Sequence, residues 1–230
     1  MTASQPKRFG LMVPANNTTI EREIPIWTDA EHCSVIRIPR PLGLLTQQDI
    51  PAYVELALQL SLQYLEDPVD VVIYGCTAAG ILAGPEKDAE IGRKLSQRTG
   101  KPVVTTATST ARWLQDTQLK RIALLTPYSD SVNQSLVAFL QAFGIGVEAL
   151  HSMQARDTEA LGDVTGEQVG EAARALMNDR CDGMFIACSQ LPTAGVREAL
   201  QAQFGRPVGS SIHATAVYAM QADQQGHPAP

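Results

Sequence analysis

The stretch DVVIYGCTAAG (residues 70–80) passes from an apolar run directly into a cysteine and then into small residues. A short apolar run bounded by glycine predicts a buried strand, and the residues after Cys76 fit the first turn of a helix. The same order recurs in DGMFIACSQLP (residues 182–192), where Cys188 follows Cys76 by 188 − 76 = 112 residues. This recurrence predicts that the chain repeats one unit of strand and helix.

Two further pairs of segments occur in the same order as the cysteine pair. KRFGLMVPANNTT (residues 7–19) matches KRIALLTPYSDS (residues 120–131), and their prolines are 127 − 14 = 113 residues apart. KPVVTTATSTA (residues 101–111) matches RPVGSSIHATA (residues 206–216), with prolines 207 − 102 = 105 residues apart. Three landmarks at nearly constant offset predict two similar lobes related by a pseudo-twofold axis.

Amphipathic helical patterns separate six short apolar runs: FGLMVP, VDVVIYG, PVVTTA, RIALLTP, DGMFIAC and PVGSSI. This alternation predicts an α/β protein with a parallel four-stranded sheet, flanked by helices, in each lobe. Ligands bind beyond the carboxyl ends of parallel strands, so we expect the active site in the cleft between the lobes. We assign residues 1–112 and 211–230 to lobe one and residues 113–210 to lobe two, because the helix after each final strand can cross over.

The composition limits the kinds of partner. The chain has 230 residues and a net charge of −6, without a cluster of Lys or Arg, so neither nucleic acid nor a membrane is expected as a partner. No stretch approaches the roughly 18 apolar residues of a membrane span, and no signal-peptide core is present. We expect a cytoplasmic protein with a small-molecule substrate and free thiols. The spacings of cysteine, histidine and glycine indicate neither a metal nor a nucleotide cofactor.

Cys76 and Cys188 are the candidate catalytic residues. Each is expected where a strand ends and a helix begins, so that amides and the helix dipole lower the thiol pKa below about 8.5. A single buried cysteine is more often a small core residue, and we interpret Cys33 and Cys181, which precede their strands, in that way. Two thiols that face one ligand can act as nucleophile and acid, or as base and acid.

Hydrogen-bond donors surround the two cysteines in the sequence. The candidate substrate-binding residues are Asn16, Asn17, Thr77, Tyr128, Ser189 and His213. The asparagines could instead cap the helix that follows them, Tyr128 could be an ordinary half-buried tyrosine, and His213 could cap a helix or lie at the surface. Because no Lys or Arg occurs in these motifs, we expect neutral donors and helix dipoles to bind any carboxylate.

Nearly the whole chain resembles the aspartate/glutamate racemase superfamily, within it the branch of maleate cis-trans isomerases and arylmalonate decarboxylases. GLMVPANNTTIEREIP is similar to the isomerase opening, YGCTAAGILAGPEKD and FIACSQLPT to the two cysteine motifs, and IALLTPYSDSVN to the tyrosine motif. The resemblance implies that Asn17 and Tyr128 contact substrate and that the protein is a homodimer. Decarboxylases of this branch carry glycine at the first cysteine, so the presence of Cys76 favours an isomerase or a racemase.

The resemblance implies conversion of maleate to fumarate without a cofactor. The Cys76 thiolate would add to C2 of maleate, and the resulting succinyl-like adduct could rotate about its new single bond. Cys188 would supply or shuttle the proton before Cys76 is expelled. Three segments depart from the isomerase pattern: DTEALGDV offers Thr158 in place of asparagine, CSQLPT replaces CTNLRT, and SSIHA replaces SSNQA. Racemisation of an amino acid or hydantoin, decarboxylation of a malonate, and ligand binding without catalysis are the alternatives.

Overall fold

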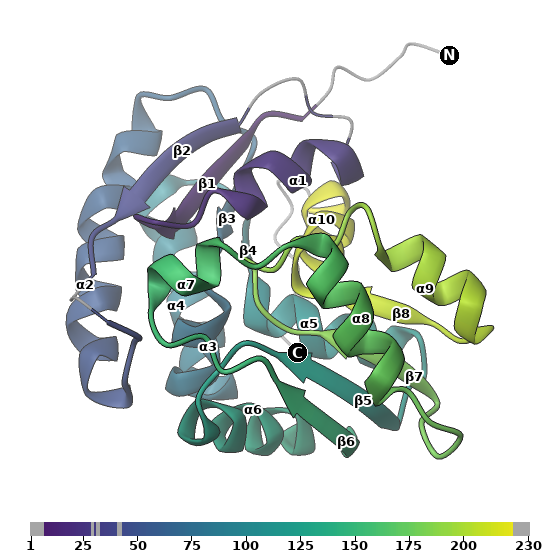
Figure 1. Cartoon of the computed structure of the whole chain (residues 1–230). Coiled ribbons are helices and arrows are strands. Elements are labelled where there is room, and N and C mark those ends of the chain that lie inside the picture. The colour runs from purple at the N-terminus through teal and green to yellow at the C-terminus, as the bar shows by residue number, and fades with distance from the viewer. Residues whose placement is uncertain (1–6, 29, 31–32, 41–42, 223–230) are drawn as a thin grey trace, which may run out of the picture.

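Two parallel sheets organise the chain, in a computed structural model that describes residues 7–28, 30, 33–40 and 43–222 (Figure 1). The first sheet has the order β2-β1-β3-β4, formed by β1 (Phe9–Pro14), β2 (Cys33–Ile38), β3 (Val71–Tyr74) and β4 (Val103–Thr105). The second has the order β6-β5-β7-β8, formed by β5 (Arg121–Thr126), β6 (Gly146–Ser152), β7 (Gly183–Ile186) and β8 (Val208–Ser210). All pairings are parallel, so the predicted fold class is confirmed.

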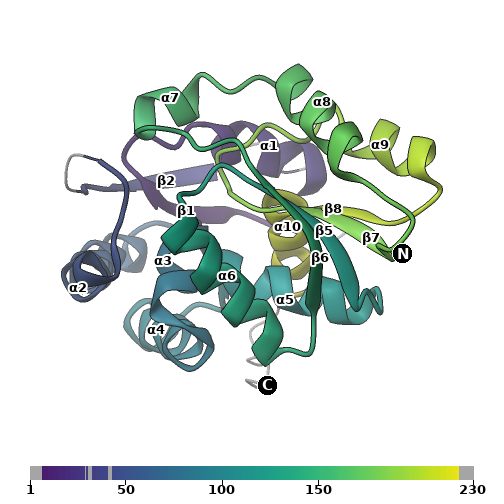
Figure 2. The same cartoon turned by 60° about the horizontal axis from the view of Figure 1, so that its bottom comes forward.

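Helices connect the strands and cover both sheets. They are α1 (Thr19–Thr28), α2 (Ile50–Leu60), α3 (Thr77–Ala83), α4 (Pro85–Thr99), α5 (Thr106–Asp116), α6 (Asp130–Ala142), α7 (Thr158–Gly162), α8 (Gly166–Leu176), α9 (Arg197–Phe204) and α10 (Ser211–Gln221). Helices α6 and α8 lie on opposite faces of the second sheet (Figure 2). Within the described part of the chain, no helix has the length and apolarity needed to cross a membrane.

The central strands are the most apolar because helices cover both of their faces. Every residue of β3 and β7 is buried, as expected for inner strands of a parallel sheet. The outer strands β2 and β6 pair on one side only, and several of their residues are half-buried or exposed. Both cysteine segments therefore leave the sheets from the centre of the molecule.

The helices that follow the last strand of each repeat cross between the two sheets. Helix α5 follows β4 but contacts β8, whereas α10 follows β8 but contacts β3, β4 and α1. The two helices also pack against each other, as Figures 1 and 2 both show. On α5, Trp113 lies so close to β8 that a Cβ added to Gly209 would be 2.4 Å from the indole ring.

This crossing is the reason for assigning the C-terminal segment to lobe one. The lobe boundaries themselves, at residues 112 and 210, stay a prediction, and residues 223–230 of the assigned segment lie outside the described residues.

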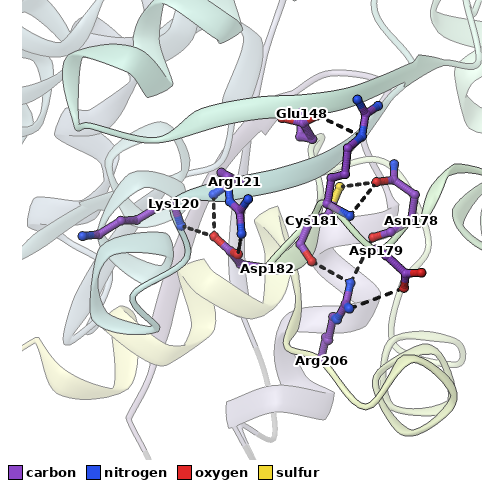
Figure 3. A network of polar contacts seen from close by, with 9 residues as sticks. Lys120, Arg121, Glu148, Asn178, Asp179, Cys181, Asp182 and Arg206 are labelled. Atoms are coloured by element: carbon purple, nitrogen blue, oxygen red, sulfur yellow. Dashed lines mark hydrogen bonds and ion pairs between the residues drawn. The ribbon is translucent and has the colours of Figure 1, made fainter.

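The amino ends of the two sheets carry the same ionic contact. The Arg8 amide donates to the Asp70 carboxylate at 2.8 Å, and its guanidinium donates to the same carboxylate at 2.9 Å. The Arg121 amide donates to Asp182 at 2.9 Å and its guanidinium at 2.8 Å (Figure 3). The partners are offset by 182 − 70 = 112 and 121 − 8 = 113 residues. The repeat seen in the sequence is therefore a repeat of contacts.

Candidate active site

Cys76 stands at the turn between β3 and α3. It is the N-cap residue of α3, with extended backbone angles, and its carbonyl accepts the Gly80 amide at 3.3 Å. Gly75 holds the turn against the neighbouring strand, because its amide donates to the Met12 carbonyl at 2.8 Å. A Cβ on Gly75 would lie 3.0 Å from Val13, so the close approach of the two segments uses the small residue. The sequence prediction of a cysteine at a helix N-terminus is confirmed here.

Cys188 occupies the matching position after β7, but no helix starts there. The chain makes a tight turn, and the next helix, α9, begins only at Arg197. Cys188 has a φ of 144°, in the region that favours glycine, so its backbone is strained. The Gln190 amide donates to the sulfur at 3.4 Å, and the Ser211 hydroxyl accepts the Cys188 amide at 3.1 Å. The expected helix N-terminus at Cys188 is therefore wrong, although the turn still supplies an amide.

Burial controls the protonation of both thiols. Burial raises the pKa of Cys188 to about 11, against the opposing effects of the Gln190 amide and the neighbouring Tyr128. Burial likewise raises the pKa of Cys76, while the Ala79 amide, Tyr53 and the charge of Arg40 act in the opposite direction. The expectation that the strand ends would lower these pKa values is wrong, because desolvation outweighs the amides. The two side chains are protonated thiols at neutral pH.

Both cysteines line one cavity, which we call the thiol pocket. It has a volume of about 40 Å³. Its lining consists of Pro14, Asn17, Arg40, Leu44, Leu45, Cys76, Thr77, Ala78, Pro127, Tyr128, Ser129, Val132, Leu161, Cys188, Ser189 and Gln190. These residues come from the carboxyl ends of strands in both sheets, as predicted from the positions of the motifs. The pocket is small and suits a compact ligand rather than a nucleotide.

Asn17 serves both as a helix cap and as part of the pocket wall. Its side-chain oxygen accepts the amides of Thr19 at 3.2 Å and Ile20 at 3.3 Å, at the start of α1. Its nitrogen donates to the Ser189 hydroxyl at 3.0 Å, and that hydroxyl donates to the Gly75 carbonyl at 2.8 Å. The two cysteine turns are thus joined through one asparagine and one serine.

Two buried hydroxyl groups in the pocket have no partner among the described residues. They belong to Tyr128 and Thr77. Burial raises the pKa of Tyr128 well above its usual value, and the adjacent Cys188 adds to this, so Tyr128 is a neutral donor. Buried polar groups are nearly always hydrogen-bonded, so two unpaired hydroxyls at a pocket indicate a place for a polar ligand.

Arg40 lines the thiol pocket, although the sequence motifs contain no cation. It lies shortly after β2, a strand missed among the apolar runs, and its guanidinium donates to the Gly43 carbonyl at 2.9 Å. Burial lowers the pKa of Arg40, and the charges of Cys76, Tyr53 and Cys188 oppose that effect. The expectation that only neutral donors surround the cysteines is therefore wrong. The signal was the segment IPRPLG, which follows a strand end as the other motifs do.

Two predicted substrate-binding residues lie outside the pocket lining. Asn16 instead bridges the sheets, since its side-chain nitrogen donates to the Thr158 carbonyl at 3.1 Å and its carbonyl accepts from Gln190 at 3.2 Å. His213 packs on α10 with its ring centroid 5.0 Å from that of Trp27, and burial lowers its pKa to about 4. The structure therefore gives both residues a packing role at the interface of the lobes.

The remaining two cysteines lie in the core away from the pocket. Cys33 begins β2 and is buried, and burial raises its pKa to about 11. Cys181 precedes β7, at the amino end of the second sheet, where its thiol faces Asn178 at 3.7 Å (Figure 3). Among the residues that the structure describes, no group of three or more His, Cys, Asp or Glu could hold a metal ion.

The fold and the pocket together define a class. Two parallel α/β sheets that each bring one cysteine to a shared pocket characterise a two-thiol enzyme scaffold. The model of the arylmalonate decarboxylase family matches residues 10–229, so the chain belongs to that family.

Similar proteins within this family are known by activity and by structure. A maleate isomerase of Nocardia farcinica is 27% identical over 227 residues, which cover 91% of this chain and 87% of that protein. The structure of the Nocardia farcinica maleate cis-trans isomerase bound to TRIS superimposes with a TM-score of 0.85 at 25% identity, covering 94% and 91% of the two chains. A cysteine-to-serine mutant of that enzyme with a covalently bound succinylcysteine intermediate superimposes with a TM-score of 0.82 at 24% identity, covering 94% and 91%.

Proposed function

We propose that the protein is a cofactor-independent cis-trans isomerase that converts maleate to fumarate. The observation that carries the proposal is the thiol pocket, where Cys76 and Cys188 come from matching strand ends of the two sheets. The maleate isomerase of Nocardia farcinica, which matches nearly the whole chain, supports the same reaction. A pocket of about 40 Å³ with unpaired donors suits a four-carbon dicarboxylate.

The first step is addition of sulfur to carbon. Cys76 loses its proton and forms a bond from sulfur to C2 of maleate, while the π electrons of C2=C3 move into the C4 carboxylate as an enediolate. Substrate binding brings an anion, so the proton leaves Cys76 with help from the α3 amides and the Arg40 charge. Thr77 and Tyr128 donate hydrogen bonds to the carboxylate in which negative charge accumulates.

The second step uses the proton of Cys188. That proton moves to C3, which gives an S-succinyl group on Cys76 with a single bond between C2 and C3. After rotation, Cys188 recovers a proton from C3, the bond from sulfur to C2 breaks, and fumarate leaves. The raised pKa of Cys188 keeps this proton on the thiol until it is needed. Asn17 and Ser189 hold the two turns in register throughout.

Substitution of each cysteine tests the assignment. We expect Cys76→Ala and Cys188→Ala to reduce maleate turnover by at least about 1,000-fold, because each removes a group that forms or breaks a bond. Cys181→Ala is the matched control, since it removes a buried thiol outside the pocket. Incubation of Cys188→Ser with maleate should leave a succinyl mass on the peptide that contains Cys76. Full turnover by Cys76→Ala would contradict the covalent mechanism.

The family of the chain makes decarboxylation of a substituted malonate the second candidate. Release of carbon dioxide from an arylmalonate, without conversion of maleate, would favour it over isomerisation. Racemisation of an amino acid would instead exchange the Cα proton with solvent deuterium, and a binding protein would show no turnover.

We also propose, from the family resemblance, that the protein forms a homodimer, and from its net charge of −6 that it works in the cytoplasm without nucleic acid or membrane. Light scattering after size exclusion tests the dimer, and a monomeric mass would contradict it.

A further inference from the structure

We infer that Arg40 binds one of the two carboxylates of the substrate and so makes the thiol pocket selective for dianions. The inference rests on the proposed function, since it names the group that recognises the second charge of a dicarboxylate. It also accounts for a charged residue that the two-thiol chemistry does not otherwise require.

The first observation is that Arg40 has no counter-ion. Its guanidinium donates to the Gly43 carbonyl, and no described carboxylate forms an ion pair with it. Arg37, three residues earlier in the chain, is paired with Glu21 outside the pocket. Arg40 is half-buried, and a desolvated charge without a partner is costly. A ligand carboxylate would supply the missing counter-ion.

The second observation is where this charge lies. Arg40 lines the same cavity as both thiols, and its charge acts on Cys76 and Cys188. The unpaired hydroxyls of Thr77 and Tyr128 belong to the same lining. The pocket therefore offers two kinds of anion contact, one from neutral hydroxyls and one from a guanidinium.

The two contacts suit the two ends of a bent dicarboxylate. A guanidinium can form two parallel hydrogen bonds to one carboxylate, which fixes its orientation as well as its position. Rotation of the adduct requires one carboxylate to stay while the other moves. Arg40 can hold the stationary carboxylate, and the pocket then turns the remainder of the molecule about the central bond.

Binding of an unreactive dicarboxylate tests the inference without any turnover. The probes are succinate and its monoamide succinamate, titrated by calorimetry into wild-type protein, Arg40→Met and Arg40→Lys. We expect the wild type to prefer succinate at least about 10-fold, because a charged hydrogen bond is lost with the monoamide. In Arg40→Met that preference should fall to about 2-fold or less, since only one anion contact is left, and Arg40→Lys should keep part of it.

Arg93→Met is the matched control, because Arg93 is exposed on α4, away from the pocket lining. It should retain the full preference for succinate. Equal preference in the wild type, or an undiminished preference in Arg40→Met, would overturn the role of Arg40. Arg40→Lys keeps the test valid if Arg40→Met fails to fold, since loss of its charge contact would then be read from a folded variant. A wild type that prefers succinate but does not convert maleate would contradict the proposed isomerase and leave the assignment of Arg40 standing.

Discussion

Asn17 and Ser189, which are 172 residues apart in the chain, form a buried hydrogen bond of 3.0 Å between the two lobes. Ser189 in turn donates to the Gly75 carbonyl, one residue before Cys76. The distance between the two thiols is therefore controlled by a direct polar link rather than by the sheets alone. A small change at either residue should shift one thiol relative to the other.

Substitution of Asn17 should separate its two roles. Asn17→Ala removes the cap of α1 and the link to Ser189, so we expect a loss of about 1–2 kcal/mol in the free energy of unfolding. Asn17→Asp keeps the acceptor for the α1 amides and should recover most of that stability, yet it places an anion at the pocket and should still weaken succinate binding. Urea denaturation and calorimetry measure the two effects. Equal destabilisation by both variants would show that capping is not the source of the stability.

The strained backbone at Cys188 predicts an unusual response to glycine. Cys188→Gly and Cys188→Ala both lose the thiol, and both should lack isomerase turnover. Because φ at this position is 144°, the glycine variant should be more stable than the alanine variant by about 1 kcal/mol. Urea midpoints of the two variants provide the comparison. A more stable alanine variant would mean that the turn relaxes without cost.

The raised pKa of Cys188 predicts a loss of stability at alkaline pH. The folded protein holds this proton to about pH 11, whereas a thiol in the unfolded chain releases it near pH 8.5. The contribution is complete below about pH 8.5 and is lost as the pH rises toward 11, by roughly 1–3 kcal/mol. We expect Cys188→Ala to lose less stability than the wild type between pH 8 and about 10.5. Identical pH dependence in urea denaturation would contradict this.

Gly209 predicts how closely the crossing helix α5 packs on β8. A Cβ there would lie 2.4 Å from Trp113, so Gly209→Ala should reduce the free energy of unfolding by about 1–3 kcal/mol through overpacking. Gly195→Ala is the control, because a Cβ at Gly195 would have no neighbour within 4 Å. If Gly209→Ala proves as stable as the control, the contact between helix and strand is looser than the structure indicates.

The repeat made most of the fold predictable from the sequence. The matching cysteine and proline segments identified the inner strands, which are apolar because they are covered on both faces. The edge strands β2 and β6 escaped notice, since their partly exposed residues break the apolar pattern. Arg40 was missed for the same reason, because it follows β2.

Two errors at the site arose from tertiary structure. The helix expected after Cys188 does not form there, since Pro192 and Gly195 follow the turn and α9 begins later. The direction of the thiol pKa shifts depends on burial, which no local pattern reports. Local sequence therefore located the thiols, while their environment required the whole molecule.

The crossing of α10 ties the first lobe to the timing of protein synthesis. Ile212 and Ala216 on this helix pack with Leu11 and Ile73 of the first sheet. All four strands of that sheet leave the ribosome about 100 residues before α10 is made, and one apolar face stays open for that time. The nascent chain would expose this face to chaperones until residues 211–221 emerge, and a product truncated before them would keep it exposed.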